Sequence, residues 1–306
     1  SSDAIKAANL NWKVTKLPLY GTNGILGVPV KGKYAVVRED KIGKQDASVF
    51  GIVGEGYTPL QNEEAFTFFD TLVAEKNAAI YHTAGALGNG ERIWILAKLP
   101  SNIIVRGDDI VNKYLLLSNN HNGKAGVQIK FTPIRVVCNN TLTAALAYGT
   151  TLSIPHYRDV HARLQQAERM LGIINFRFGE IEESFKQMAR VQMNEYRVDK
   201  YLNEVFPDPL DPSKGVNLKK AADNRSLAKH LFAEGKGNKM PGVAGTLWAA
   251  YNGVTELIDH RLSGFSKRTD NTNDSRRLNS IWFGQGSAVK SRAFTVAMEK
   301  SVVWTN

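Results

Sequence analysis

The chain has 306 residues, of which 43% are hydrophobic, and its formal charge is +10 with a pI near 9.5. This length and apolar content suffice for the core of one large domain or two ordinary ones. No run approaches the roughly 18 consecutive apolar residues of a membrane span, and the one cysteine, Cys138, excludes an internal disulfide. We therefore expect a cytoplasmic protein without membrane contact.

The first 156 residues are typical of antiparallel β-structure. Short runs of β-branched and aromatic residues are separated by glycine, proline and asparagine, and they cover 11–20, 32–40, 79–85, 91–99, 113–120 and 125–131. The sequences "ALGNG" and "HNGK" are hairpin signals between the later runs. One helix is expected after Pro59, with Asn62 as its N-cap and an apolar stripe that includes Phe66.

Alternation along the strand "ERIWILAKL" gives it two different faces. Ile93, Ile95, Ala97 and Leu99 fall on one face, and Arg92, Trp94, Leu96 and Lys98 fall on the other. Cations that follow a phosphate backbone and a ring that stacks on a base are what a single-stranded nucleic-acid platform needs. Lys130 of the neighbouring strand and Lys124 before it extend this predicted surface. The alternative is the ordinary solvated face of an antiparallel sheet.

The stretch "FTPIRVVCNNTLTAAL", residues 131–146, places polar residues inside an apolar run. It predicts a strand that passes into a helix, with Asn140 or Thr141 as N-cap. Arg135, Asn139 and Asn140 could then hold a phosphate at the helix N-terminus. The alternative is that the asparagines only satisfy backbone groups in a buried turn. Cys138 is expected to be a small core residue rather than a nucleophile.

Residues 157–306 are predicted to be helical, which divides the chain into regions 1–156 and 157–306. The first run is a long helix, or a pair broken near Gly172 to Gly179, and "PDPLDPSKG" ends it. Helices follow over 218–235, over 241–262 and over a last segment. That segment kinks near Gly284 and Gly286, and 263–275 is expected to be a polar loop.

The positive charge is concentrated in parts of the chain. No acidic residue lies between Ile110 and Arg158, and residues 261–306 hold eight basic residues against three acidic ones. Such clustering favours a binding footprint for a polyanion over scattered surface charge. In the C-terminal segment the candidate nucleic-acid contacts are Arg276, Arg277, Lys290 and Arg292.

A search for catalytic motifs finds little. The six histidines show no metal-ligand spacing, and no paired-acid, phosphate-loop or nucleophile-elbow motif occurs. We therefore assign no catalytic residue, metal or cofactor from the sequence. A site assembled only by the fold stays open, with Glu256, Asp259 and His260 as its candidate groups.

Eight segments in a fixed order resemble a family of phage- and plasmid-like proteins of unknown function. They span about residues 10 to 298 and include "YTPLQNEEAFTFFDTLV", "RIWILAKLP", "TPIRVVCNNTL" and "GTLWAAYNGVTELIDH". The resemblance implies a mobile genetic element and a role in handling DNA. The layout, a sheet followed by a long helix, looks like that of single-strand annealing proteins of the RecT and Redβ type, although layout alone does not establish function.

These observations lead to one main hypothesis and two alternatives. We expect an α+β protein that binds DNA in a bacterial host cell, favours single strands, promotes annealing or recombination and forms homo-oligomers. The first alternative is a protein that inhibits a host defence factor through its helices. The second is an enzyme that processes nucleic acid.

Overall fold

The computed structural model describes residues 2–22, 27–66, 80–142, 151–154, 171–211, 215–262 and 271–305. Antiparallel sheets occupy the N-terminal half and helices the C-terminal half, so the predicted α+β class is confirmed. The predicted boundary at 156/157 lies outside the described residues. The chain folds into two compact units that alternate along the sequence; unit 1 comprises 1–100, 114–130 and 151–174, and unit 2 comprises 101–113, 131–150 and 175–306.

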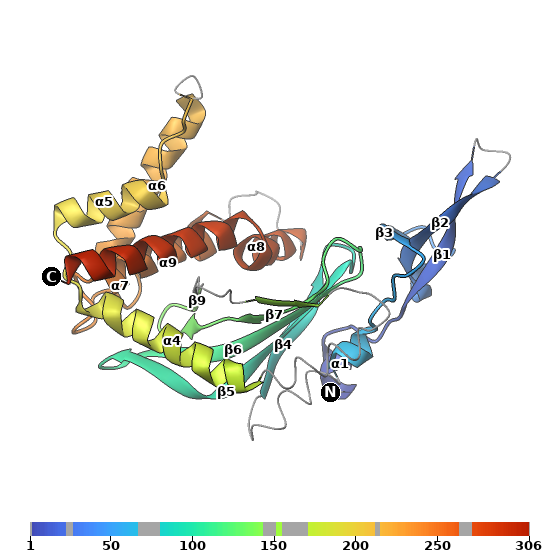
Figure 1. Ribbon diagram of the computed structural model, residues 1–306, viewed down its shortest axis with the longest axis horizontal. Helices are drawn as coiled ribbons and strands as arrows, with labels where there is room; N and C mark the ends of the chain where they lie inside the picture. Colours follow the sequence, from blue (N-terminus) through green and yellow to red (C-terminus); the bar gives the residue numbers. More distant parts are fainter. Residues whose placement is uncertain are drawn as a thin grey trace. The chain divides into compact units, whose positions relative to one another are not determined.

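Unit 1 contains a three-stranded antiparallel sheet, which we call the ribbon sheet (Figure 1). Its strands run in the order β1, β2, β3, with bounds Val14–Thr22, Gly27–Arg38 and Val49–Gly54. Across the sheet Leu17 pairs with Ala35, and Ala35 pairs with Ile52. Because side chains alternate along each strand, these three residues share one face. Val14, Val36 and Val53 belong to the opposite face, and all three are buried.

The buried face of the ribbon sheet packs on one turn of unit 1, at residues 121–123. Gly51 contacts the backbone of Asn122, and the side chain of Val53 contacts Gly123, which has a φ of 72°. A Cβ at either glycine would collide with its neighbour. Phe50 stacks on His121, with ring centroids 6.2 Å apart. These contacts leave the face of Leu17 and Ile52 directed to solvent.

The helix predicted after Pro59 begins at residue 62, and the described part of it ends at residue 66. Asn62 is not its N-cap. The side-chain amide of Asn62 is buried and donates to the carbonyls of Leu10 and Trp12. Glu64 instead accepts from the backbone N–H of Gln61 at 2.7 Å, as the acidic residue of a capping box does. The helix was therefore predicted from the sequence with its start one residue late and with the wrong residue as its cap.

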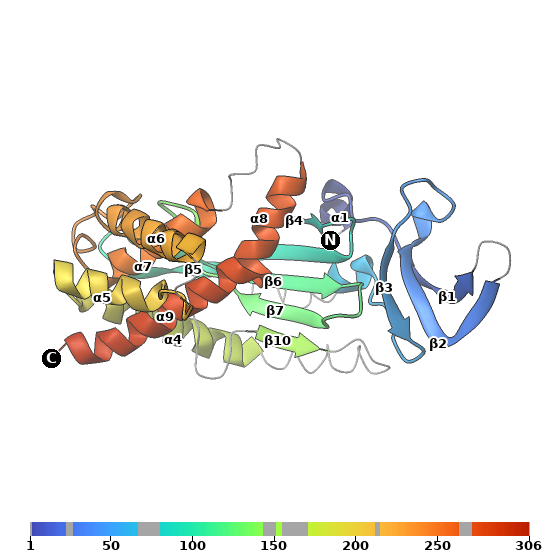
Figure 2. The same cartoon turned by 90° about the horizontal axis from the view of Figure 1, so that it is seen from above.

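A second sheet has seven strands, five of which follow the order β10, β7, β6, β5, β4 (Figure 2). Their bounds in chain order are Ile80–Leu87 for β4, Arg92–Arg106 for β5, Asp109–Asn120 for β6, Val127–Phe131 for β7 and Thr151–Ile154 for β10. The predicted hairpins at "ALGNG" and "HNGK" are confirmed, because they join β4 to β5 and β6 to β7. The short strands β8, Ile134–Arg135, and β9, Asn140–Thr141, pair beside β6.

Unit 2 holds most of the described helices. They are α4 (Leu171–Arg190), α5 (Glu195–Val205), α6 (Gly215–Glu234), α7 (Leu247–Glu256), α8 (Asn271–Phe283) and α9 (Gln285–Trp304), and the π-helical turn Leu257–Arg261 continues α7. In the described part of the chain, no helix is both long and apolar enough to cross a membrane.

The helix boundaries confirm some predictions and correct others. The predicted breaks at "PDPLDPSKG" and at Gly284 are confirmed. The first run was predicted as one long helix or as a pair broken near Gly172 to Gly179. In the described residues α4 has no break between these glycines, and the chain leaves the helix only between Arg190 and Glu195. The Asn194 side chain caps α5 by accepting from the N–H of Arg197. Helix α7 starts after Thr246, not at Pro241, because Thr246 caps the N–H of Ala249.

Candidate functional site

The predicted nucleic-acid surface on β5 is wrong in its central residue. Trp94 is only 6% exposed, and Leu96 of the same face is 3% exposed. The indole lies over Gly85 on β4, where a Cβ would come within 3.2 Å of the ring. Residues 93–97 are buried on both faces of the strand. A buried ring cannot stack on a base, so Trp94 is a core residue.

Of the four cations predicted on and beside β5, three are half-buried and one is exposed. Arg92 is half-buried, and its Nε donates to the Asn120 side chain at 2.7 Å. Burial lowers the pKa of Arg92, with a smaller opposing effect from Glu91. Lys98 and Lys130 are half-buried on β5 and β7, and strand β6 separates them. Lys124 is exposed in the turn between β6 and β7.

Arg135 is fully buried and anchors a hydrogen-bond network that we call the Arg135 centre. Its Nε and Nη2 donate to the two carboxylate oxygens of Asp109 at 2.8 and 2.9 Å. Nη1 donates to the Asn238 side chain, and the carbonyls of Lys236 and Gly237 accept further bonds. The indole N–H of Trp248 completes the shell of Asp109 at 2.7 Å. The guanidinium is therefore committed inside the protein, and the prediction that it holds a phosphate is wrong.

Asn139 and Asn140, which follow Arg135, lie in a turn and in β9 and not at a helix start; residues 143–150, where the predicted helix would continue, lie outside the described residues. Residues 136–139 form a turn that joins β8 to β9, and Asn139 has a φ of 55° in that turn. Asn and Asp tolerate this left-handed region better than most residues, so the residue type suits the turn. Asn140 is buried, and its amide donates to Asn252 and Thr255. The predicted N-cap at Asn140 or Thr141 is wrong, whereas Asn139 is exposed beside a cavity.

Lys290 is also fully buried, contrary to its predicted role on a basic surface. Its Nζ donates to Asp259 Oδ1 at 2.8 Å, to the Thr141 carbonyl at 2.8 Å and to Thr141 Oγ1 at 2.7 Å. Asp259 Oδ2 accepts from the backbone N–H and the hydroxyl of Thr141. These bonds use all three ammonium protons. We call this group the Lys290 centre; it ties β9, the π-helical turn and α9 together.

A cavity of about 440 Å³ lies beside the Lys290 centre in unit 2. Asn139 and Thr141 line it from β9 and its turn, Asp259 and His260 from the π-helical turn, and Arg277 and Trp282 from α8. π-Helical turns often occur at functional sites. Burial lowers the pKa of His260, and Asp259 opposes that shift more weakly. The imidazole is therefore mainly neutral at pH 7. Sequence reasoning named several of these residues separately but did not bring them together.

Two further groups considered for catalysis are Glu256, which is hydrogen-bonded inside the protein, and Cys138, whose thiol is protonated. Glu256 is buried and accepts from the backbone N–H of Lys236 at 2.9 Å. Burial raises the pKa of Cys138 to about 11, so the thiol stays protonated at neutral pH and behaves as a core residue. Among the described residues, no group of three His, Cys, Asp or Glu side chains could hold a metal ion.

Two C-terminal cations are exposed in unit 2. Arg276 is exposed on α8, and Arg292 is exposed on α9 with its Nε bonded to the Val205 carbonyl at 2.8 Å. Arg292 also lines a second cavity of about 430 Å³ together with Lys220. Lys290, the candidate contact that lies between these two in the sequence, is buried and unavailable to a ligand at the surface.

The ribbon sheet carries exposed cations that sequence reasoning missed. Between Ala4 and Arg38 the sequence has six basic residues and no acidic one. Lys31 and Lys33 are exposed on β2, and among the described residues neither has a carboxylate partner within ion-pair distance. Lys16, by contrast, has partners within the protein. Its Nζ donates to the Glu55 carbonyl and lies 5.0 Å from the Tyr34 ring centroid. The absence of carboxylates from this run was the available sequence signal.

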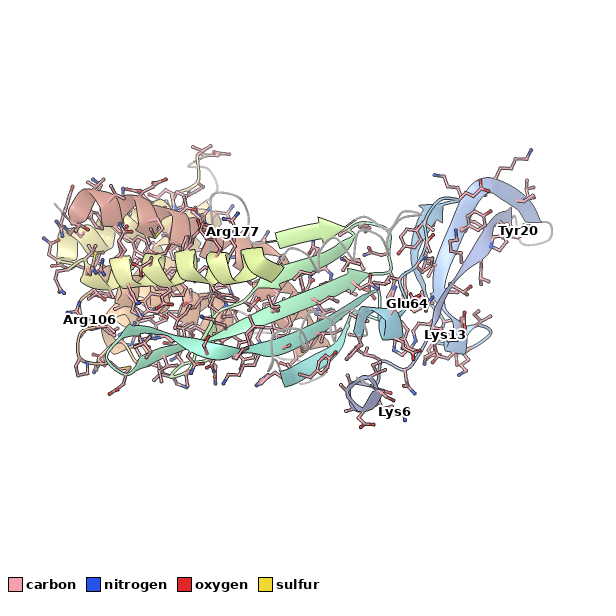
Figure 3. The ribbon with its side chains drawn as sticks, turned by 60° about the horizontal axis from the view of Figure 1, so that its bottom comes forward. Lys6, Lys13, Tyr20, Glu64, Arg106 and Arg177 are labelled. Carbon is pink, nitrogen blue, oxygen red and sulfur yellow. The ribbon has the colours of Figure 1, made fainter. Side chains whose placement is uncertain are left out.

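The same sheet exposes large apolar side chains. Ile52 is 58% exposed and Val49 is 55% exposed on the face that points away from the protein core. Toward the far end of β1 and β2, Tyr20 is 57% exposed and Val28 is 68% exposed, and Figure 3 shows Tyr20 on this ribbon. Contiguous exposed apolar residues on a soluble protein often mark an interaction site. The ribbon sheet therefore carries exposed lysines together with exposed apolar and aromatic side chains.

One protein family matches most of the chain. Its sequence profile covers residues 49–282 and is described as a domain of unknown function, DUF932. The chain belongs to the DUF932 family. A comparison with curated proteins found no match, and a comparison with solved structures found none either. The DUF932 region contains the Arg135 centre and the cavity-lining residues from Asn139 to Trp282. Strands β1 and β2 precede this region, and α9 with Lys290 follows it.

Proposed function

We propose that this protein binds nucleic acid, with a preference for single-stranded DNA, on the exposed face of the ribbon sheet. The observation that carries the proposal is the pairing of unneutralised cations with exposed apolar side chains on one small sheet. Lys31 and Lys33 supply the charge, and Tyr20 and Ile52 supply ring and aliphatic surface. Earlier expectations for Trp94, Arg135 and Lys290 play no part in it.

The register of the sheet explains how such a surface would accept a strand. Leu17, Ala35 and Ile52 form one row across the three strands, and Thr15, Val37 and Val49 form the next row. Base faces can pack on the exposed Leu17, Ile52 and Val49 of these rows, the exposed Tyr20 ring farther along β1 offers a separate stacking surface, and lysines neutralise phosphates. Base–aromatic stacking contributes about 1 to 3 kcal/mol per base and depends little on sequence.

The apolar component favours a single strand over a duplex. In a duplex the base faces are stacked on one another, and a protein meets mainly phosphates, sugars and base edges. Exposed isoleucine, valine and tyrosine side chains gain little from such groups. A single strand offers unstacked bases that remove this apolar area from water.

The charge of the ribbon sheet argues against self-association through the same face. A second copy would bring a second set of like charges against Lys31 and Lys33, which opposes pairing of the two surfaces. A polyanion removes that repulsion. A homo-oligomer, as expected from the sequence, would therefore use another surface.

The biological setting is part of the proposal. The resemblance to phage- and plasmid-like proteins supports a mobile element in a bacterial cytoplasm, and the layout likeness to RecT- and Redβ-type proteins suggests strand annealing as the activity to test. Annealing is measured by mixing complementary labelled oligonucleotides with the protein. The expected result is a faster rate of duplex formation than without protein.

Binding itself is tested with a labelled oligonucleotide titrated at several salt concentrations. The variant Lys31→Gln/Lys33→Gln should weaken binding and reduce the log–log salt slope by about 1.4, since each phosphate contact contributes about 0.7 on single strands. The matched control is Lys219→Gln/Lys239→Gln, which removes the same charge from exposed positions in unit 2. Equal slopes for the two variants would mean that only net charge matters.

The stacking component has its own variant pair. Tyr20→Ala should reduce affinity for single strands about 5- to 100-fold, in line with one stacked base, while Tyr196→Ala, at another exposed tyrosine, should leave it unchanged. Wild-type affinity in both Tyr20→Ala and the double lysine variant would overturn the proposal. The exposed face would then suit a protein partner, as in the host-factor alternative.

A further inference from the structure

The cavity beside the Lys290 centre has the wall of a small-molecule site. Its volume of about 440 Å³ lies inside the roughly 300 to 1,000 Å³ typical of such sites. One side consists of polar groups from β9, its turn and the π-helical turn. The other side is α8, which contributes Leu278, Ile281 and Trp282. The wall therefore combines hydrogen-bonding groups with an apolar and aromatic surface.

The two charged side chains that line the cavity, Asp259 and Arg277, have opposite signs and differ in how fully they are hydrogen-bonded. The Asp259 carboxylate lines it, but Lys290 and Thr141 already bond both of its oxygens. Arg277 has no comparable set of partners. Its Nη1 makes one long bond of 3.3 Å to the Asp259 carbonyl, and its Nε lies 4.0 Å from the exposed Asp274 carboxylate. Among the described residues, the Arg277 guanidinium therefore donates far fewer hydrogen bonds than the Arg135 guanidinium does.

Hydrogen bonds hold the two polar elements of the cavity wall that face α8. Lys290 locks the π-helical turn to β9, and the Asn139 turn is held by a backbone bond from Asn139 to Arg135 at 2.9 Å. A half-buried guanidinium with unused donors in a fixed setting is suited to bind a phosphate through two parallel hydrogen bonds. His260 and Asn139 lie within the same wall and can accept or donate further hydrogen bonds.

We propose that this cavity binds a nucleoside monophosphate, with the phosphate on Arg277 and the base against Ile281 and Trp282. The phosphate matches the Arg277 guanidinium, which makes only long contacts among the described residues, and the planar base matches the apolar wall of α8. The site belongs to unit 2 and uses none of the ribbon-sheet residues. It is therefore independent of the proposed function.

The test is calorimetric titration of the full chain with the four nucleoside monophosphates, supported by the shift in Tm that a ligand of the folded state produces. We expect saturable binding of at least one of them. Adenosine and inorganic phosphate serve as separate probes of the two halves, and each should bind at least about tenfold more weakly than the complete ligand, because each makes only part of the contacts.

The matched variants are neighbours on α8. Arg277→Gln should weaken binding about tenfold or more, because it removes a charge-assisted contact. Arg276→Gln removes the same charge from an exposed position beside it and should bind as the wild type does. Arg277→Lys keeps the charge without the planar fork and should give an intermediate affinity. A Tm close to that of the wild type without ligand shows that each variant is folded.

Several results would overturn the inference. These are no binding by any of the four monophosphates, wild-type affinity in Arg277→Gln, and adenosine or phosphate binding as tightly as the monophosphate. The Lys31→Gln/Lys33→Gln variant should bind the monophosphate normally. Loss of monophosphate binding in that variant would place the ligand on the ribbon sheet and would also overturn the inference.

Discussion

The basic residues of unit 2 and those of the ribbon sheet look alike in the sequence but differ in the fold. Arg135 and Lys290 are fully buried and bonded to Asp109 and Asp259, whereas Lys31 is exposed and has no carboxylate partner among the described residues. A cluster of basic residues in the sequence does not by itself predict a surface that binds a polyanion. The cations must also lack carboxylates close to them in space, because such carboxylates neutralise them even when they lie far away in the sequence.

The two buried pairs differ from surface ion pairs in how their polar atoms are satisfied. Charges are costly to remove from water, and that cost is offset only where hydrogen bonds complete the shell of each group. The Arg135 centre reaches this state with five acceptor contacts, and the Lys290 centre reaches it with three. Their role is to fix how β8, β9 and the helices of unit 2 meet.

The largest expected effect is the loss of Arg135. Arg135→Met leaves the Asp109 carboxylate buried without its cation, which should lower the free energy of unfolding by about 3 to 5 kcal/mol. Adding Asp109→Leu should restore part of that loss. Chemical denaturation measures both. Arg225→Met, at a half-exposed pair with Asp208, is the control and should cost about 0 to 1 kcal/mol. Equal losses at Arg135 and Arg225 would contradict the comparison.

Lys290 gives a similar test within one helix. Lys290→Met should lower the free energy of unfolding by about 3 kcal/mol, because Asp259 keeps only the bonds from Thr141. Lys300 also lies on α9 and pairs with Glu204 near the surface. Lys300→Met should cost about 1 kcal/mol or less. Thermal unfolding of both variants checks the difference, and a milder effect at Lys290 than at Lys300 would refute the burial argument.

The smallest effect on stability is expected in the ribbon sheet. Lys31→Gln/Lys33→Gln should change the free energy of unfolding by no more than about 0.5 kcal/mol, since both side chains are exposed and unpaired among the described residues. The same variant should weaken binding of single strands. A large loss of stability would show that these lysines hold the sheet together, and the change in binding would then have a structural cause.

Turn-forming residues and periodicity in the sequence predicted where strands lie and where most helices break. They were less successful in predicting which face of a strand is exposed and which residue caps a helix. Gly284 and the prolines of "PDPLDPSKG" lie at helix breaks, because the backbone conformations that glycine and proline favour are local properties. Gly172 and Gly179 lie inside α4, so glycine alone does not end a helix. The face of Trp94 was predicted from alternation alone, which assumes one wet side. Strand β5 is buried on both sides over residues 93–97, and no local signal distinguishes that case from a half-exposed strand.

The sequence by itself determined the α+β class, the hairpins, the main helix breaks and the excess of positive charge, because turn chemistry, periodicity and composition are local or additive. Only the tertiary structure decided which cations are available. Arg135 meets Asp109, and Lys290 meets Asp259, across separations of 26 and 31 residues. Such pairs form when distant segments pack, so the burial of one charge depends on a partner that its own neighbourhood in the sequence does not contain.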